Sequence, residues 1–266
     1  MRKKWKILDD QRCLLKSGTA YSPVEPYNEV FANYVCDALG IKDYVHYKIS
    51  TSENNGKTIP ISICPCFISP DTELVSGIDI IYSPVGKRSG YPQLSYERYV
   101  YTANILGVEN IEDSLSDMFL LDLVINNVDR HYNNFGLIRD VNTLKFVGVA
   151  PIYDCGTSMY AKSSAHMLEH YDIESDLSTS RPIIAQSLRG QMKYISSNRL
   201  NKVCELYGLE TKYRELYSKF NLLPNDQIVK VWSLFKSRID FACREWDLCK
   251  DKNREKTKGK GREIER

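Results

Sequence analysis

The sequence predicts an α+β protein of two lobes, a small β-rich lobe followed by a larger, mainly helical lobe. Two observations favour this fold class. In the first seventy residues, runs of alternating apolar and polar residues flank turn signals, with one helical stretch between them. After Pro70, apolar residues recur at three- and four-residue spacing, which is the period of helices. We expect an N-lobe at 1–69, a C-lobe at 70–249 and a basic, disordered tail at 250–266.

Two hairpins are expected in the N-lobe. The first pairs Trp5–Leu8 with Arg12–Lys16 around the Asp9-Asp10 turn. In the second, Val45, Tyr47 and Ile49 alternate with polar residues, as do Ile59, Ile61 and Ile63, and Asn54-Asn55-Gly56 lies between the two runs. Between the hairpins, Pro26 and Gly40 mark the start and the end of a predicted helix, because proline is tolerated in a first turn and glycine ends helices.

The C-lobe is expected to contain three main helices, at Tyr96–Leu106, Ser114–Val128 and Asp226–Leu248. Ser114 begins a Ser-Leu-Ser-Asp sequence that matches a helix-capping pattern. The segment Lys162–Arg181 is polar and lacks a clear period, so we expect a long surface loop there.

Composition limits the classes of function. The chain of 266 residues is 42% hydrophobic, and its net charge is +2. Residues 250–266 hold eight Lys/Arg and four Asp/Glu, which leaves 28 basic and 30 acidic residues elsewhere. A nucleic-acid-binding function would therefore rest on the tail alone. No stretch approaches the roughly 18 apolar residues of a membrane span, and no signal peptide is visible, so we expect a cytoplasmic protein without a membrane partner.

The eight cysteines lie scattered in segments that are otherwise apolar or helical. This distribution is typical of free, structural cysteines in a reducing compartment. Cys64 and Cys66 form the one close pair, and no second pair faces them at zinc-site spacing.

The most informative segment is Ile125–Gly136, in which polar residues follow the end of an apolar helix. Gly136–Arg139 and Leu144–Val149 are expected to pair as strands after it. Because a hairpin returns the chain to where it began, Asn134 before the first strand and Asp154 after the second should lie close together.

An Asp, an Asn and a second Asp that converge in this way suit phosphoryl transfer, in which oxygen ligands hold Mg²⁺ on nucleotide phosphates and a carboxylate orients the attacking hydroxyl. Asp129 precedes Asn134 by five residues, the interval found in the catalytic loop of protein kinases, and Asp154-Cys155-Gly156 stands where those enzymes carry Asp-Phe-Gly. Taken singly, each carboxylate is equally well explained as a cap or a solvated loop residue.

The segment Asn127–Asn134 resembles the Asn-x-Asp-Arg-His-x-x-Asn loop of HipA-type toxin kinases and, more distantly, of phosphoinositide kinases. Pro151-Ile-Tyr-Asp154 is similar to the metal-binding motif of the same family, and Pro26-Tyr-Asn-Glu29 to its N-lobe helix start. The resemblance implies a bilobal, protein-kinase-like fold and a kinase that transfers the γ-phosphate of ATP to a hydroxyl acceptor. We expect a protein Ser/Thr as that acceptor, although the loop itself does not distinguish it from a smaller hydroxyl compound or from the enzyme's own residues. It also suggests a cognate regulatory or antitoxin protein as a partner.

Carried over to this chain, the resemblance makes Asp129 the base or orienter of the substrate hydroxyl and makes Asn134 and Asp154 the Mg²⁺ ligands. Lys16 would contact the ATP phosphates, with Glu29 as its ion-pair partner. Without the family, Lys16 would be interpreted as a surface lysine at the end of a strand.

The resemblance assigns four further residues to the nucleotide site and one to the catalytic loop. Pro65, Cys66 and Phe67 occupy the place of the interlobe segment that holds adenine, and Tyr153 adjoins Asp154. His131 belongs to the catalytic loop, which we expect it to brace with Arg130 through hydrogen bonds.

One departure from the family pattern concerns the phosphate loop. HipA-type kinases place a loop of glycines or small residues before the strand that bears the lysine, whereas this chain has no glycine before Gly18. The backbone amides that would cradle phosphates are therefore missing or are supplied by Met1–Lys4. Either Met1 is an internal start of a longer protein, or nucleotide is held differently. The alternative function is therefore a catalytically inactive, kinase-like binding or regulatory module.

His166-Met-Leu-Glu-His170 matches the H-x-x-E-H pattern of inverted zinc peptidases. Its polar surroundings and the lack of a third-ligand motif favour a solvated loop or a short helix instead.

Overall fold

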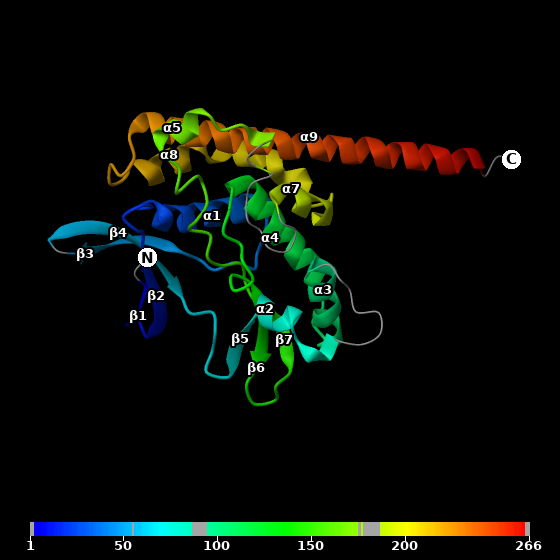
Figure 1. Cartoon of the computed structure of the whole chain (residues 1–266), viewed down its shortest axis with the longest axis horizontal. Coiled ribbons are helices and arrows are strands. Elements are labelled where there is room, and N and C mark those ends of the chain that lie inside the picture. The colour runs from blue at the N-terminus through cyan, green and yellow to red at the C-terminus, as the bar shows by residue number, and fades with distance from the viewer. Residues whose placement is uncertain (1–2, 55, 87–94, 175–176, 178–186, 264–266) are drawn as a thin grey trace.

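The computed structural model describes residues 3–54, 56–86, 95–174, 177 and 187–263. Within them the chain forms a mixed α/β fold with a small antiparallel sheet, a second sheet and a large helical part (Figure 1). The predicted α+β class, with its small β-rich part and larger helical part, is confirmed. The first sheet has the strand order β1 (Lys3–Leu8), β2 (Gln11–Ser17), β4 (Lys57–Pro65), β3 (Lys48–Asn54).

Both predicted hairpins of the first sheet form. The backbones of Asp9 and Asp10 adopt positive φ angles of 49° and 59°, which a two-residue hairpin turn requires. Helix α1 (Glu25–Leu39) has Pro26 in its first turn, and Gly40, at a φ of 72°, ends it. The Ile41 N–H bonds back across Gly40 to the Cys36 carbonyl at 2.9 Å, a helix end in which the residue at position 40 is left-handed and glycine is favoured.

The second sheet contains the predicted hairpin and one strand that the sequence analysis missed. Strands β6 (Gly136–Asp140) and β7 (Phe146–Val149) pair as expected, and β5 (Thr72–Ser76) adds to the free edge of β6. A Cβ atom at Gly136 would lie 2.2 Å from the Val75 carbonyl oxygen, so the close approach of β5 requires glycine there.

The helical part contains the three predicted helices and several shorter ones. Its elements are α2 (Gly77–Ile81), η1 (Pro84–Gly86), α3 (Ser95–Ile105), α4 (Ile111–Ile125), α5 (Ala165–Glu169), α7 (Leu188–Gln191), η2 (Met192–Tyr194), η3 (Leu200–Leu209), α8 (Glu210–Ser218) and α9 (Asn225–Glu263). Among the described residues, no helix combines the length and the apolar character needed to cross a bilayer.

Three helix boundaries differ from expectation. Helix α4 begins after Asn110, so Ser114 lies inside its first turns and the predicted cap at Ser114 is wrong. Helix α9 continues to Glu263, whereas the sequence predicts disorder after residue 249. Because lysine, arginine and glutamate favour helices, the basic composition does not by itself end α9. Within the predicted loop Lys162–Arg181, Ala165–Glu169 forms a single helical turn, and residues 175–176 and 178–181 lie outside the described part.

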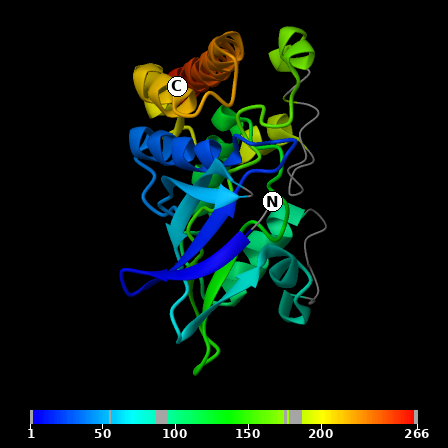
Figure 2. The ribbon, with the colours of Figure 1, turned by 90° about the vertical axis from the view of Figure 1, so that its left-hand side faces the viewer.

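Helix α1 packs against elements of both predicted lobes. It lies between the first sheet and the helices α8 and α9 (Figures 1 and 2). The Phe31 ring makes edge contacts with Tyr213 and Phe235, with centroids 5.4 and 5.3 Å away. One cluster of buried side chains runs from α1 through α4 to α9. The boundary between residues 69 and 70 stays a prediction, because the core crosses it.

The free cysteines of the described part differ in exposure, and Cys66 and Cys243 are half-buried. Cys13, Cys36, Cys64 and Cys155 are buried, as expected for structural cysteines. Cys204 differs, because it is exposed on η3 with its sulfur 2.6 Å from that of Cys243 on α9.

Candidate active site

Four of the sequence-predicted site residues line one cleft of about 540 Å³. They are Asp129, His131, Asn134 and Asp154. The remaining lining residues come from the start of β1, the loop after β2, the start of α1 and the segment after Asp154: Lys3, Thr19, Tyr21, Ser22, Glu25, Gly156, Thr157 and Lys162.

The hairpin β6–β7 brings Asn134 and Asp154 together, as the sequence predicts. Asn134 lies two residues before β6, and the chain leaves β7 towards Asp154. The Ile152 N–H donates to the Asp43 carbonyl at 2.8 Å, which ties the outgoing segment to the first lobe. Asp154 itself has a φ of 58°, a left-handed conformation that costs a non-glycine residue free energy and that the surrounding contacts must impose.

Lys16 on β2, Glu29 on α1 and Asp154 form a cluster of three charges. The Lys16 Nζ contacts Glu29 Oε1 and lies 2.5 Å from Asp154 Oδ1. The other oxygen of Glu29 accepts the Cys155 N–H at 2.8 Å. Lys16 and Glu29 are 2% and 1% exposed, so their charges are largely withdrawn from water and depend on each other.

The pKa values of this cluster follow from burial and mutual attraction. Burial alone would lower the pKa of Lys16, but Glu29 and Asp154 raise it above its ordinary value. Burial would raise the pKa of Asp154, but the attraction of Lys16 lowers it to about 2. Burial raises the pKa of Glu29, and Lys16 opposes that rise. Lys16 is therefore protonated and Asp154 ionised at neutral pH.

Arg130 braces the loop from Asp129 to Asn134 from inside. Its side chain is 1% exposed, and it donates to both carboxylate oxygens of Asp122 on α4 at 2.9–3.3 Å. The same guanidinium donates to the carbonyls of Asn134 and Tyr153, at 2.9 and 2.5 Å. One side chain thus fixes the backbone on both sides of the cleft. The sequence analysis missed Asp122, although a carboxylate inside a strongly apolar helix was a signal for a buried partner.

Asp129 and Asn134 are positioned by short loop contacts. The Asp129 carbonyl accepts the Asn134 Nδ2 at 3.0 Å and the His131 N–H at 2.9 Å. The Nδ1 of His131 accepts the Asn133 N–H at 3.2 Å, which orients the imidazole ring within the loop. Because the amide nitrogen of Asn134 is held by the backbone, its oxygen is the atom available to a cation.

The donor atoms fit Mg²⁺. Asn134 Oδ1 and the Asp154 carboxylate are hard oxygen ligands on the same cleft, and Mg²⁺ in such sites uses one or two carboxylates together with substrate phosphates. The described residues contain no group of three or more His, Cys, Asp or Glu side chains that could hold a metal alone. His166 and His170 lie with rings 4.5 Å apart at α5, without the third ligand that zinc needs.

The residues predicted to hold adenine lie beside the cleft, and none of them lines it. The Cys66 N–H donates to the Arg12 carbonyl at 2.8 Å, which continues the pairing of Cys13 with Pro65. Phe67 packs against the Tyr153 ring at 5.4 Å, and the Tyr153 hydroxyl donates to the Asn133 carbonyl at 2.8 Å. Their role in nucleotide binding stays a prediction.

Three residues near the cluster were given no side-chain role in the site by the sequence analysis. Lys3 lines the cleft, with its Nζ 3.5 Å from Asp154 Oδ2. The Lys16 Nζ lies over the Tyr47 ring, 5.3 Å from the ring centroid. Asn28, beside Glu29, donates through Nδ2 to the carbonyls of Gly156 and Ser158, at 2.8 and 2.7 Å. Asn28 thereby anchors α1 to the segment that carries Asp154.

The fold is that of a kinase. Among solved structures, the chain is similar to the crystal structure of the Helicobacter pylori proinflammatory kinase CtkA, with a TM-score of 0.63, over 93% of this chain and 95% of that chain. The sequence identity across this match is 17%, so the likeness concerns the fold alone.

A shorter match is found in sequence. Over 47 residues the chain is 40% identical to the serine/threonine-protein kinase CtkA of Helicobacter pylori, which corresponds to 18% of this chain and 14% of that protein. No protein-family model matches the chain. The comparisons support a relationship to a serine/threonine kinase, and membership of the HipA-type family stays a prediction.

Proposed function

We propose that this chain is an ATP-dependent kinase that transfers the γ-phosphate to a hydroxyl group of a protein serine or threonine. The observation that carries the proposal is the cleft, where Asp129, Asn134 and Asp154 meet and Lys16 is held against Asp154. The likeness to CtkA, described as a serine/threonine-protein kinase, supports the reaction and the acceptor class.

Each residue has a physical task in this proposal. Lys16 has three N–H donors, of which Glu29 and Asp154 use two, so one remains to bind a phosphate oxygen. Asn134 and Asp154 would hold Mg²⁺, which neutralises charge on the phosphates when bound. The half-buried carboxylate of Asp129 would orient the acceptor hydroxyl and accept its proton.

Two further expectations do not rest on the geometry of the cleft. A cytoplasmic location is expected from the sequence composition and the scattered cysteines, and a cognate regulatory or antitoxin protein is expected as a partner from the motif resemblance. Copurification of the full chain with its natural neighbours in the cell tests the second.

The alternative function is an inactive kinase-like module. It is favoured by the two lysines, Lys3 and Lys16, that already contact the two carboxylate oxygens of Asp154, the candidate metal ligand. Calorimetry with ATP, with and without Mg²⁺, and an assay with γ-labelled ATP separate the two. Magnesium-dependent binding with phosphate transfer supports the kinase, and binding without transfer supports the module. The absence of binding at millimolar ATP would overturn both the active kinase and an inactive module that binds nucleotide.

Asn134→Ala and Asp154→Asn should each weaken Mg-ATP binding at least about tenfold, because each removes or alters an oxygen ligand of a hard cation. Asn133→Ala is the matched control, since this exposed neighbour does not line the cleft. Calorimetry in the presence of Mg²⁺ measures all three variants. If a variant at position 134 or 154 binds Mg-ATP as tightly as the Asn133→Ala control, the residue that it replaces is not a metal ligand.

A further inference from the structure

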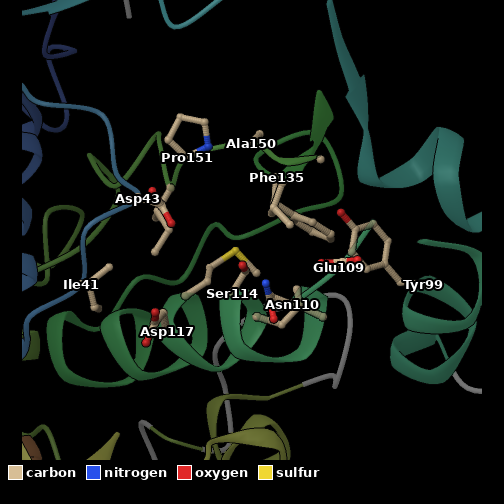
Figure 3. A pocket seen from close by; sticks show the side chains of 15 residues that line it. Ile41, Asp43, Tyr99, Glu109, Asn110, Ser114, Asp117, Phe135, Ala150 and Pro151 are labelled. Carbon is tan, nitrogen blue, oxygen red and sulfur yellow. The ribbon is translucent and has the colours of Figure 1, made fainter. Parts of the chain in front are cut away.

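A second cavity, of about 250 Å³, lies apart from the catalytic cleft and shares no lining residue with it. Its walls come from the start of α4, from the loop before β3 and from the segments that enter β6 and leave β7 (Figure 3). Leu115, Met118 and Phe135 make part of its lining apolar. The pocket is therefore suited to a small ligand with an apolar part.

Carboxylates border this apolar space. Asp43, Glu109 and Asp117 line the pocket from three different segments (Figure 3), and no lysine or arginine is among its described lining residues. Arg199 forms an ion pair with Asp117, at 2.9 Å between Nε and Oδ1. Burial raises the pKa of Asp117 to about 6; Arg199 opposes this, and Asp113 and Asp43 add to it. A cation in the pocket would relieve this repulsion between carboxylates.

A buried hydroxyl in the same pocket lacks a partner. Tyr99 is fully buried and lines the pocket, and its hydroxyl has no hydrogen-bond partner within the described part of the chain. Figure 3 shows the hydroxyl turned towards the side of the pocket where Phe135 lies. Burying a hydroxyl without a partner costs free energy, which a bound donor would recover. Asn110, at the N-cap position of α4, also lines the pocket, and its side chain makes no capping hydrogen bond.

We propose that this pocket binds an alkylguanidinium group, such as the end of an arginine side chain or of a free guanidino compound. A planar guanidinium can bind carboxylates through paired N–H donors and can stack on an aromatic ring such as Phe135. Its aliphatic stem would pack on Leu115 and Met118, and its remaining N–H would reach the Tyr99 hydroxyl.

The position of the pocket gives the ligand a route to the catalytic segments. Phe135 and Gly136 follow Asn134 directly, and Ala150–Ile152 lead to Asp154. A ligand in the pocket would therefore contact the backbone that carries both candidate metal ligands. Binding itself does not depend on the proposed kinase activity, so it can be tested separately.

Calorimetry of the full chain with n-butylguanidinium tests the proposal, with the neutral isostere n-butylurea as the reference ligand. The cation should bind at least about tenfold more tightly than the urea, since the carboxylates favour charge. Asp43→Asn and Glu109→Gln should each weaken cation binding several-fold. Glu112→Gln is the matched control, because this carboxylate is exposed on α4, three residues after Glu109, and does not line the pocket. Equal binding of the two ligands, or an equal loss in the control, would overturn the proposal.

Tyr99→Phe distinguishes a ligand-binding role of the Tyr99 hydroxyl from a merely structural one. This variant should bind n-butylguanidinium several-fold more weakly, while its Tm stays unchanged or rises, because the hydroxyl has no hydrogen-bond partner among the described residues to lose. A fall in Tm with unchanged cation affinity would show a structural hydroxyl and would contradict the assignment.

A capped Gly-Arg-Gly peptide distinguishes the two sources of the guanidinium group, a protein arginine and a free guanidino compound. Binding of the peptide points to a protein side chain, binding of the small cation alone points to a free compound, and binding of neither refutes the site.

Discussion

Asp129→Asn is expected to lower phosphate transfer by about a hundredfold or more while Mg-ATP affinity stays unchanged. The substitution keeps the shape of the side chain and removes its charge and its capacity to accept a proton. The contacts that order the loop use the backbone carbonyl of Asp129, which accepts from Asn134 and His131, so they survive the change. Nucleotide affinity depends instead on Lys16 and on the metal ligands, because the acceptor hydroxyl is absent during nucleotide binding.

A γ-labelled ATP assay gives the rate for Asp129→Asn and calorimetry the affinity. Asp71→Asn, an exposed aspartate outside the cleft, is the control for a general effect of losing one carboxylate. Unchanged transfer would remove Asp129 from the catalytic machinery. Joint loss of transfer, ATP binding and thermal stability would instead identify a structural role.

Lys16→Met is expected to lower the free energy of unfolding by about 3 kcal/mol at neutral pH, because it leaves the carboxylates of Glu29 and Asp154 without their buried cation. Methionine preserves most of the volume of the stem, so lost charge pairing dominates the effect. Lys3→Met is the matched control. Its ammonium lies 3.5 Å from Asp154, but its side chain is 48% exposed, and such pairs contribute at most about 1 kcal/mol.

The effect of Lys16→Met should depend on pH. The pKa of Asp154 is lowered to about 2 in the folded chain, so its stabilising contribution is present above its ordinary pKa near 3.8 and is lost as pH falls from about 4 towards 2. In Lys16→Met the attraction that lowers this pKa is gone, and burial then favours the protonated form. The stability deficit of the variant should therefore shrink below about pH 4. A deficit that is constant between pH 7 and pH 3 in urea unfolding would contradict this electrostatic account.

Local patterns in the sequence were sufficient to predict the elements on which the cleft is built. The hairpin turn at Asp9-Asp10 and the end of α1 at Gly40 are determined by residues only a few positions away. These two features therefore do not depend on distant contacts. The meeting of Asn134 with Asp154 follows from the geometry of one hairpin.

Features that depend on distant contacts were not predictable in the same way. Strand β5 is five residues long, is half-buried and pairs with a segment sixty or more residues away, so its own sequence carries a weak signal. The contact between Arg130 and Asp122 could be expected only after α4 and the catalytic loop had been placed against each other. The unpartnered hydroxyl of Tyr99 is a property of the packed core and leaves no trace in local periodicity.

The anchoring of helix α1 bears on how the cleft can be switched. In protein kinases, the position of the helix that carries the glutamate partner of the lysine is itself a control point. Here Asn28 ties that helix to the segment after Asp154, and Phe31 packs into the helices α8 and α9. Outward rotation of α1 would have to expose core aromatic rings and break two buried hydrogen bonds at once. Control of the proposed kinase through an outward rotation of α1 is therefore energetically disfavoured.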